Sequence, residues 1–311
     1  MGHLALDSES LHGRLLFAIP KKGRLHEKCL ELLAGADIQF RRHNRLDVAL
    51  VQNHPDIALV FLPAADIPSF VGKGNVDLGI TGRDVILEAQ MESYVTEVLP
   101  LGFGRCKLQV QVPERGAIRT VDDLAGKRVV TSFEVLAAKH FAAVDERLGL
   151  VGEQRTQIEY VGGSVEAACA LGLADGIVDL VESGDTMRAA GLHAIDTVLP
   201  TEAVLIRSRA AKSAAHARII DKIHARVRGV IAAREYVVCE YNIPRASLAV
   251  AAAVTPGRRA PTVSPLDAVN GEEWIAISAM VRKEEVADTM DRLTEVGAED
   301  ILIFNLDNCR V

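Results

Sequence analysis

The sequence has few cysteines, and none of them lies at a metal-binding spacing. Its five cysteines are odd in number and widely scattered, and no CxxC pair occurs. The nine histidines likewise form no HxxxH or HExxH pattern. These absences argue against a disulfide framework and against a metal held by protein ligands. We therefore predict no protein-bound metal, and free thiols in a reducing compartment.

Long apolar runs and an excess of basic residues are also missing. No stretch approaches twenty uninterrupted apolar residues, and the N-terminal sequence MGHLALDSES is polar. We therefore expect no membrane span and no signal peptide, and a cytoplasmic location. The net charge of −7, without a basic tail, argues against nucleic acid as a partner. A small anionic ligand stays compatible, because backbone amides and a few cations bind phosphate even on an acidic protein.

Aromatic residues are scarce, so the core must be aliphatic. They make up 4% of the chain, whereas hydrophobic residues as a whole make up 49%. Short apolar runs, such as residues 57–62 and 76–81, alternate with helical periodicity, and this alternation predicts an α/β architecture. The runs are apolar throughout, as is typical of strands covered on both faces. Glycine-containing turns follow several of them, where open α/β sheets bind ligands.

A different pattern begins near residue 213. Apolar residues recur at helical spacing over residues 219–231, and residues 236–306 predict the order β, α, β, β, α, β. That order is the ferredoxin-like unit. The predicted parts are a first lobe of residues 1–105 and 188–212, a second lobe of residues 106–187, and a C-terminal domain of residues 213–311. By composition alone, this last domain is a dimerisation or stability element.

The segment that says most about function is Ile177-Val-Asp-Leu-Val-Glu-Ser-Gly-Asp-Thr-Met-Arg. A buried strand leads into a short polar loop and then into a helix start, where unpaired N–H groups favour a phosphate. Ser183 and Thr186 add hydroxyl donors, and Gly184 allows the backbone to approach closely. Asp179 can accept hydrogen bonds from the vicinal hydroxyls of a ribose. An ordinary capped helix has similar residues, so the segment alone leaves both interpretations open.

A longer pattern includes that segment: Glu166-x5-Gly172-x-Ala174-x2-Ile177-x-Asp179-Leu180-x2-Ser183-Gly184-x-Thr186-Met187. It resembles the signature of the ATP phosphoribosyltransferase family. Further strings similar to that family occur through nearly the whole chain, namely Pro20-Lys-Lys-Gly-Arg-Leu25, Val76-Asp-Leu-Gly-Ile-Thr-Gly82, Gly162-Gly-Ser-Val-Glu166 and Thr255-Pro-Gly-Arg-Arg-Ala-Pro-Thr262. Several long, unrelated strings in the right order are not expected by chance.

The resemblance is to the long form of the family, and it implies both a fold and a reaction. The implied fold is α/β, with a two-lobed, periplasmic-binding-protein-like catalytic region and a C-terminal ferredoxin-like (βαββαβ) regulatory domain. In the implied reaction, the first step of histidine biosynthesis, adenine N1 of ATP attacks C1 of phosphoribosyl pyrophosphate and releases pyrophosphate. Such a displacement depends mainly on positioning and electrostatic stabilisation.

The resemblance also implies site residues. Lys22 and Arg24 would stabilise the departing pyrophosphate, although a basic turn in solvent has the same sequence. Arg45 resembles a second family arginine, and Arg41 and Arg42 are close enough in sequence to be confused with it. The implied sugar-donor site comprises Asp179, Glu182, Ser183, Gly184, Asp185 and Thr186. The implied contacts to pyrophosphate or ATP are Gly23, Thr81, Gly82, Thr131, Gly163, Ser164 and Glu166, of which Gly82 and Glu166 could equally be structural.

Further properties of the family extend to cofactors, partners and regulation. Mg²⁺ is implied because both polyphosphates carry it, with few direct protein ligands. The C-terminal domain is implied to sense histidine as a feedback inhibitor, at positions that match Asn242, Thr262 and Met280. A homo-oligomer, from dimer to hexamer, is implied by the family and not by any residue pattern.

Other functional classes stay open at this point. Periplasmic binding proteins share the two-lobed layout and do no chemistry, although the polar N-terminus argues against an exported receptor. A transcription regulator would need a helix-turn-helix region, and none precedes Leu15. A catalytically inert partner of another enzyme would not need Lys22, Arg24 and Asp179. Incubation with both substrates discriminates among these classes, because only an enzyme releases pyrophosphate.

Overall fold

The apolar runs of the first two hundred residues form two mixed β-sheets in the computed structural model, which describes residues 11–42, 46–210, 213–267 and 271–310. The first sheet has the strand order β2-β3-β1-β4-β11-β5. Its strands are β1 (Leu15–Pro20), β2 (Val48–Leu50), β3 (Ile57–Leu62), β4 (Leu78–Gly82), β5 (Val95–Pro100) and β11 (Ala203–Ser208). The helical elements between them are α2 (His26–Gly35), η1 (Ala64–Asp66), α3 (Ile67–Gly72) and α4 (Arg83–Glu88).

The second sheet has the strand order β10-β6-β9-β7-β8. Its strands are β6 (Cys106–Pro113), β7 (Arg128–Thr131), β8 (Gln157–Tyr160), β9 (Gly176–Val181) and β10 (Leu192–Thr201). Its helical elements are α5 (Val121–Leu124), α6 (Glu134–Leu148), η2 (Gly152–Gln154), α7 (Ala167–Ala170) and α8 (Asp185–Ala189). Fully buried aliphatic residues of β6, β7 and β9 pack with Phe141 of α6 to form the core of this lobe. The predicted two-lobed α/β class is confirmed.

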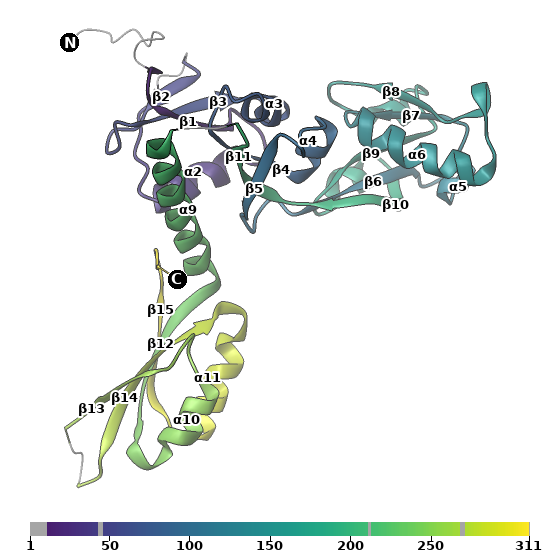
Figure 1. Cartoon of the computed structure of the whole chain (residues 1–311). Coiled ribbons are helices and arrows are strands. Elements are labelled where there is room, and N and C mark those ends of the chain that lie inside the picture. The colour runs from purple at the N-terminus through teal and green to yellow at the C-terminus, as the bar shows by residue number, and fades with distance from the viewer. Residues whose placement is uncertain (1–10, 43–45, 211–212, 268–270, 311) are drawn as a thin grey trace. The chain divides into compact units, whose positions relative to one another are not determined.

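Two connections join the lobes, and Figure 1 shows the long strands β6 and β10 leading from the first sheet into the second. The first connection, residues 101–105, joins β5 to β6, and the second is Glu202, between β10 and β11. The sequence predicts that residues 188–212 return to the first lobe. Instead, β10 pairs with β6 in the second sheet, and only β11 pairs with β4 and β5. β10 is mostly half-buried and interrupted by two register shifts, so it lacks the apolar run that reveals a buried strand.

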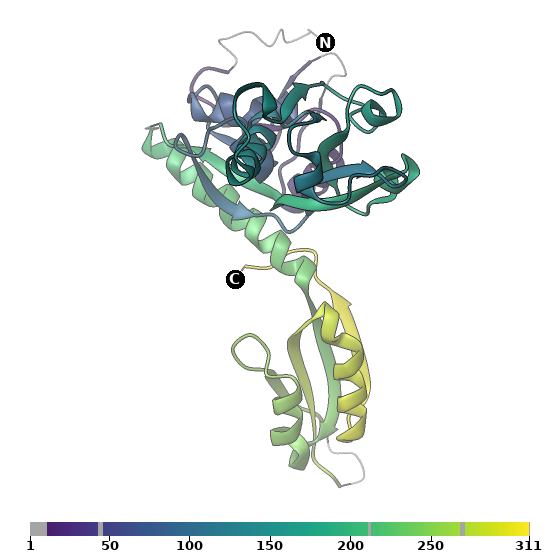
Figure 2. The same ribbon diagram turned by 90° about the vertical axis from the view of Figure 1, so that its right-hand side faces the viewer.

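The C-terminal part begins with α9 (Ala214–Glu235) and continues as the predicted βαββαβ unit. Its further elements are β12 (Tyr236–Pro244), η3 (Arg245–Ser247), α10 (Leu248–Val254), β13 (Thr262–Pro265), β14 (Trp274–Arg282), η4 (Lys283–Glu285), α11 (Val286–Glu295) and β15 (Glu299–Asn305). The antiparallel strand order β13-β14-β12-β15 is the ferredoxin-like order. Figure 2 shows α10 and α11 on one face of this sheet.

The chain divides into two compact units, and the two lobes together form the first of them. The first unit contains the described residues up to Glu31 and the stretch Ile38–Ile220, and the second contains Leu32–Asp37 and the stretch from Asp221 onward. The second unit has its own core, in which Tyr241 is buried and its hydroxyl lies 2.7 Å from the Thr255 hydroxyl. The sequence places the start of the C-terminal domain at residue 213, just before α9, whereas the compact units divide within α9, after Ile220.

Helix α4 links the two lobes through Glu88. Both Glu88 carboxylate oxygens accept backbone N–H groups at the start of α6, from Val135 at 2.9 Å and from Leu136 at 3.0 Å. The residue that precedes α6, Phe133, supplies no side-chain cap of its own. Glu88 therefore satisfies two of the amides that a helix start leaves unpaired.

Replacing Glu88 should destabilise the fold measurably. We expect Glu88→Ala to lower the free energy of unfolding by about 1–2 kcal/mol, because two half-buried amides lose a charged acceptor. Denaturant unfolding measures this difference. Glu92→Ala is the matched control, since Glu92 is exposed and lies just beyond α4. Equal unfolding free energies for the two variants would show that the cap contributes nothing.

Candidate functional site

A cavity of about 260 Å³ lies where β9 ends and α8 begins. It brings together Arg24 from the first lobe and the predicted residues of the second. Its lining residues are Arg24, Gln111, Glu166, Asp179, Leu180, Val181, Glu182, Ser183, Gly184, Asp185, Thr186 and Met187. All six residues that the sequence assigns to the sugar-donor site are among them. The strand end positions these side chains, because β9 is buried at its first three residues and rises to the surface at its end.

The turn between β9 and α8 depends on Gly184. This residue has φ of 80°, in the left-handed region that a side chain disfavours, and it immediately precedes α8. The Ser183 hydroxyl donates to Asp185 Oδ2 at 2.6 Å, and Arg188 donates to Asp185 Oδ1 at 2.7 Å. These contacts, with Ser183 contributing most, lower the pKa of Asp185. In this state Asp185 therefore holds the loop together and stays ionised.

Asp179 is the half-buried carboxylate of the cavity. Its Oδ1 accepts the backbone N–H of Leu180 at 2.8 Å, and Gln111 donates to its carbonyl oxygen at 3.4 Å. Burial is the main cause of a raised pKa for Asp179, and the negative charge of Glu166 raises this pKa further. The hydrogen bond from Leu180 and the positive charge of Arg24 lower the pKa, but they offset only part of the increase. Because Asp179 lines the cavity, its carboxylate can accept hydrogen bonds from ligand hydroxyls.

Arg24 is the cation that the first lobe contributes. Its guanidinium lies 3.6 Å from the Glu182 carboxylate, and its side chain is 33% exposed. Burial lowers the pKa of Arg24, but a hydrogen bond with the Cys106 thiol and the charges of Glu182 and Asp84 raise it overall. The thiol itself stays protonated, because burial raises the pKa of Cys106. Arg24 is therefore a permanent positive charge facing the strand that holds Asp179.

The other predicted phosphate contacts lie outside this cavity. Lys22 and Gly23 are exposed on the loop after β1, where Gly23 has φ of 90°. Gly163 and Ser164 form an exposed loop after β8. Arg45 lies outside the described residues.

Thr81, Gly82 and Thr131 have structural tasks at strand ends. Thr81 is fully buried and donates to the carbonyl oxygen of Ala64 at 3.3 Å. Thr131 is also fully buried. Its hydroxyl donates to the carbonyl oxygen of Val178 at 2.7 Å and accepts the Phe133 N–H at 2.9 Å. A β-carbon at Gly82 would collide with the Asp84 carboxylate. These observations favour packing as the reason for all three residues.

Sequence reasoning missed a buried polar pair beside the cavity. The Thr201 hydroxyl donates to Asp84 Oδ1 at 2.6 Å and accepts the Asp84 N–H at 3.0 Å. Asp84 is 2% exposed, and its charge acts on both Arg24 and Cys106. The signal available in the sequence was an acid two residues beyond the glycine that ends β4. Its partner could not be inferred, since it lies 117 positions away.

The three residues predicted to bind histidine share the face of the C-terminal sheet that α10 and α11 leave uncovered. Asn242 donates to Asp300 Oδ2 at 3.0 Å, Thr262 lies on the exposed edge strand β13, and Met280 is half-buried. A cavity of about 280 Å³ in this unit has Met280 in its lining but neither Asn242 nor Thr262. Tyr236 also lines it, and the guanidinium carbons of Arg258 and Arg282 each lie 5.5 Å from the Tyr236 ring centroid.

The described residues contain neither a metal-binding cluster nor a helix able to span a membrane. Within the described ranges, no group of three or more His, Cys, Asp or Glu side chains is arranged to hold a metal ion. The same residues include no helix with the length and apolar character needed to cross a membrane. All five cysteines are free.

Comparisons with known proteins agree along the chain. The family profile described as ATP phosphoribosyltransferase matches residues 63–229, and the one described as HisG, C-terminal domain, matches residues 233–308. The chain is 57% identical over 303 residues to the ATP phosphoribosyltransferase of Yarrowia lipolytica, covering 97% of this chain and 98% of the relative. It is 53% identical over 308 residues to that of Schizosaccharomyces pombe, covering 96% and 98%. Among solved structures, the ATP phosphoribosyl transferase (HisG:HisZ) complex from Thermotoga maritima is similar in fold, with a TM-score of 0.56 and 24% identity, covering 69% of this chain and 98% of that one.

Proposed function

This chain belongs to the ATP phosphoribosyltransferase family, in its long form with the C-terminal domain, and we propose that the cavity at the end of β9 is where its reaction takes place. The enzyme condenses ATP with phosphoribosyl pyrophosphate in the first step of histidine biosynthesis. The assignment rests on one observation. Arg24 of the first lobe lies 3.6 Å from the Glu182 carboxylate of the second lobe, and both line the same cavity as Asp179.

The sugar donor fits this cavity by size and by chemistry. A volume of about 260 Å³ suits a phosphoribosyl group better than a whole nucleotide. The amides and hydroxyls from Ser183 to Thr186 bind the 5′-phosphate, once Ser183 turns its hydroxyl from Asp185 to the ligand. Asp179 and Glu182 accept hydrogen bonds from the two ribose hydroxyls. Charged hydrogen bonds of this kind hold the sugar in one orientation.

The protein contributes charge and position to the bond exchange. The lone pair of adenine N1 forms the new bond to C1 while the C1–O bond breaks and its electron pair leaves with pyrophosphate. Arg24, with Lys22 from the same loop, stabilises the negative charge on the departing group. The carboxylates of Asp179 and Glu182 face the sugar, where positive charge develops. Neutral N1 already has its lone pair, so the attack needs no general base.

Mg²⁺ enters as part of the substrates. ATP and phosphoribosyl pyrophosphate both carry the ion on their phosphates, and Mg²⁺ keeps several water ligands when bound this way. The carboxylates that line the cavity do not form a metal-binding group among the described residues, which suits an Mg²⁺ ion that is bound mainly by substrate phosphates. Arg24 and Lys22 then share the neutralisation of pyrophosphate with the metal.

Histidine acts on the C-terminal domain as a feedback inhibitor. We assign it to the uncovered sheet face with Asn242, Thr262 and Met280, where the amide and hydroxyl suit an amino acid. Leu302 and Phe304 on the same sheet are 51% and 48% exposed, which supports a homo-oligomer, from dimer to hexamer, that covers this face. Inhibition then requires histidine to prefer one quaternary state.

Five free thiols are consistent with a cytoplasmic location.

A turnover assay tests the proposal. Incubation with ATP, phosphoribosyl pyrophosphate and Mg²⁺ should give pyrophosphate and a new ultraviolet absorbance from the N1-substituted adenine, because both are products of the same bond exchange. Added histidine should lower the rate. Binding of both substrates without pyrophosphate release would instead identify a solute-binding module.

A further inference from the structure

Helix α2 begins beside Arg24 and ends in the second compact unit. Its first turn is joined to the Arg24 loop, since the His26 amide donates to the carbonyl oxygen of Gly23 at 3.0 Å and His26 Nδ1 lies 2.6 Å from the carbonyl oxygen of Pro20. Its last turn falls within Leu32–Asp37, the short stretch that belongs to the second unit. The helix therefore extends from the loop of a catalytic cation into the unit that contains the C-terminal domain.

Two side chains of the second unit hold the end of α2. Asn308, in the C-terminal tail of residues 306–310, donates from Nδ2 to the carbonyl oxygen of Gly35 at 2.8 Å. Arg226 of α9 donates to the carbonyl oxygens of Ala36 and Asp37, at 3.1 Å each. A helix end leaves such carbonyl groups unpaired, and its partial negative charge favours a nearby cation. Because α2 has no basic residue in its last turn, Arg226 supplies that charge.

The segments around these contacts pack closely enough to require glycine. A β-carbon at Gly35 would lie 3.0 Å from a methyl carbon of Val230 on α9. A β-carbon at Gly229 would collide with the carbonyl oxygen of Cys309 in the C-terminal tail. The Cys309 amide also donates to the Gly229 carbonyl oxygen at 3.4 Å. The tail, α9 and the end of α2 are therefore in close contact, so a displacement of the tail shifts the end of α2.

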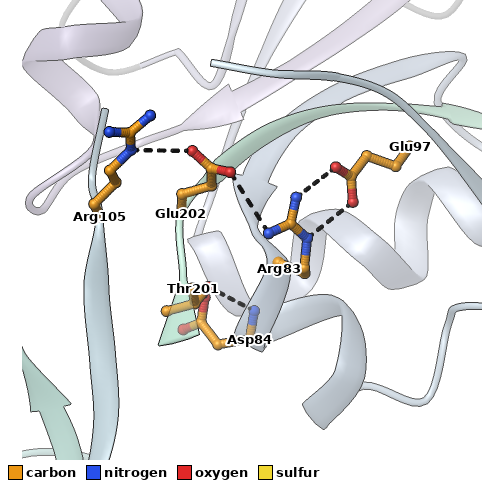
Figure 3. Close-up of polar contacts among 6 residues, drawn as sticks. All are labelled: Arg83, Asp84, Glu97, Arg105, Thr201 and Glu202. Carbon is orange, nitrogen blue, oxygen red and sulfur yellow. Dashed lines mark hydrogen bonds and ion pairs between the residues drawn. The ribbon is translucent and has the colours of Figure 1, made fainter. Parts of the chain in front are cut away.

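The charged contacts beside the two connections between the lobes lie within the first unit. Figure 3 shows Arg83 between Glu97 and Glu202. Arg83 donates to Glu97 at 3.1 and 2.6 Å, and Glu202 lies 3.6 Å from it. Arg105 lies 3.5 Å from Glu202, and all four residues belong to the first unit. Among the described helices, α2 and α9 extend from one unit into the other, and α2 is the one that begins beside a residue lining the cavity at the end of β9.

We propose that Asn308 and Arg226 are positioning residues for Arg24 and act on it through α2. By holding the end of the helix they fix the loop at its start, so that the Arg24 guanidinium meets the departing pyrophosphate. An α-helix suits this task, because its ten residues span about 15 Å as one stiff element. The inference rests on the proposed function, which assigns the leaving group to Arg24. The unit to which we assign histidine thereby contributes to the position of a catalytic cation.

The kinetic test uses the full chain. Asn308→Ala and Arg226→Ala should each lower kcat about tenfold, because a displaced charge stabilises the transition state less. The KM values for both substrates should change by less than about twofold, since the residues that bind the substrates stay in place. Asn305→Ala and Arg218→Ala, at exposed positions of β15 and α9, are the matched controls and should keep the wild-type kcat.

Further variants separate positioning from a purely structural role. In the Arg24→Ala background, Asn308→Ala should cause no further loss of kcat, because the tail acts on the reaction through Arg24, whereas a general weakening of the fold would lower both rates. Arg226→Lys keeps a positive donor and should recover part of the rate that Arg226→Ala loses. Asn308→Asp has nearly the same shape but cannot donate to Gly35, so it should slow turnover as alanine does. Since Asn308 is exposed, both of its variants should fold.

Amide hydrogen exchange measures the same link without turnover. The amides of His26 and Cys29, in the first turn of α2, donate to the carbonyl oxygens of Gly23 and Leu25. In Asn308→Ala these amides should exchange about tenfold faster, because the first turn opens more readily once the other end of the helix is released. The Asn305→Ala control should leave both exchange rates unchanged.

The inference is overturned if both alanine variants keep the wild-type kcat, or if Asn308→Ala slows the Arg24→Ala variant by the same factor as the wild type. Unchanged exchange at the start of α2 would also count against it, whatever the rates. A wild-type chain that formed no product, while Asn308→Ala still raised the exchange rate of His26, would instead refute the proposed function and leave the link through α2 in place.

Discussion

Arg24→Ala is expected to lower kcat by about a thousandfold, or roughly 4 kcal/mol of transition-state stabilisation. The side chain comes from the first lobe and reaches the acids of the second, lying 3.6 Å from Glu182. Its charge is needed most when pyrophosphate departs, because the bond to C1 then releases an electron pair onto oxygen. Removing it should therefore change kcat more than either KM. Initial-rate kinetics with both substrates varied gives all three constants.

Two further measurements separate this role from a structural one. Among the described residues, Arg24 forms one ion pair, with Glu182, and that pair is partly exposed, so the alanine variant should unfold at nearly the same denaturant concentration as the wild type. Arg24→Lys keeps the charge but loses the planar fork, and it should recover only part of the rate. A variant that folded normally and turned over at the wild-type rate would remove Arg24 from the mechanism.

Replacing Asp179 should weaken binding of phosphoribosyl pyrophosphate, whereas Asp179→Asn should stabilise the fold at neutral pH. The carboxylate accepts ribose hydroxyls, and a hydrogen bond to a charged group is worth about 1.5–3 kcal/mol. We expect Asp179→Ala to raise the KM for phosphoribosyl pyrophosphate about a hundredfold, and Asp179→Asn, which keeps one acceptor oxygen, about tenfold. Donor titrations at fixed ATP measure both. The KM for ATP serves as the internal control.

The stability effect follows from the raised pKa of Asp179, which burial causes. A carboxyl whose folded pKa lies above its unfolded value destabilises the fold when ionised, and this penalty fades as pH falls through the folded pKa. Asp179→Asn should therefore unfold at a higher temperature than the wild type at neutral pH, and the difference should shrink in acid. The donor KM of the wild type should rise as pH falls through the same pKa. A less stable asparagine variant at neutral pH would contradict this account.

The parts that were predictable from the sequence are those in which local pattern and tertiary structure agree. Continuous apolar runs became buried strands such as β3, and the ferredoxin-like order followed from the periodicity of residues 236–306. The loop at Gly184 was also predictable, because its glycine, hydroxyls and strand end lie together in the sequence. Each of these features is decided by neighbours along the chain.

The parts that escaped prediction depend on partners far apart in sequence. Thr201 and Asp84 are separated by 117 positions, and Glu88 caps a helix 47 positions away. No periodicity marks either pair. Thr81 and Thr131, which the sequence suggests as ligand contacts, have hydroxyls that already donate to the carbonyl oxygens of Ala64 and Val178.

The position of β11 has a consequence for synthesis on the ribosome. This strand lies between β4 and β5 in the first sheet, yet it emerges only after the whole second lobe has been made. The second lobe, continuous from Cys106 to Thr201, can therefore close first. Until Ala203–Ser208 arrives, β4 and β5 each present an unpaired edge, the kind of surface to which chaperones and stray strands bind. The first lobe to be translated is thus the last to be finished.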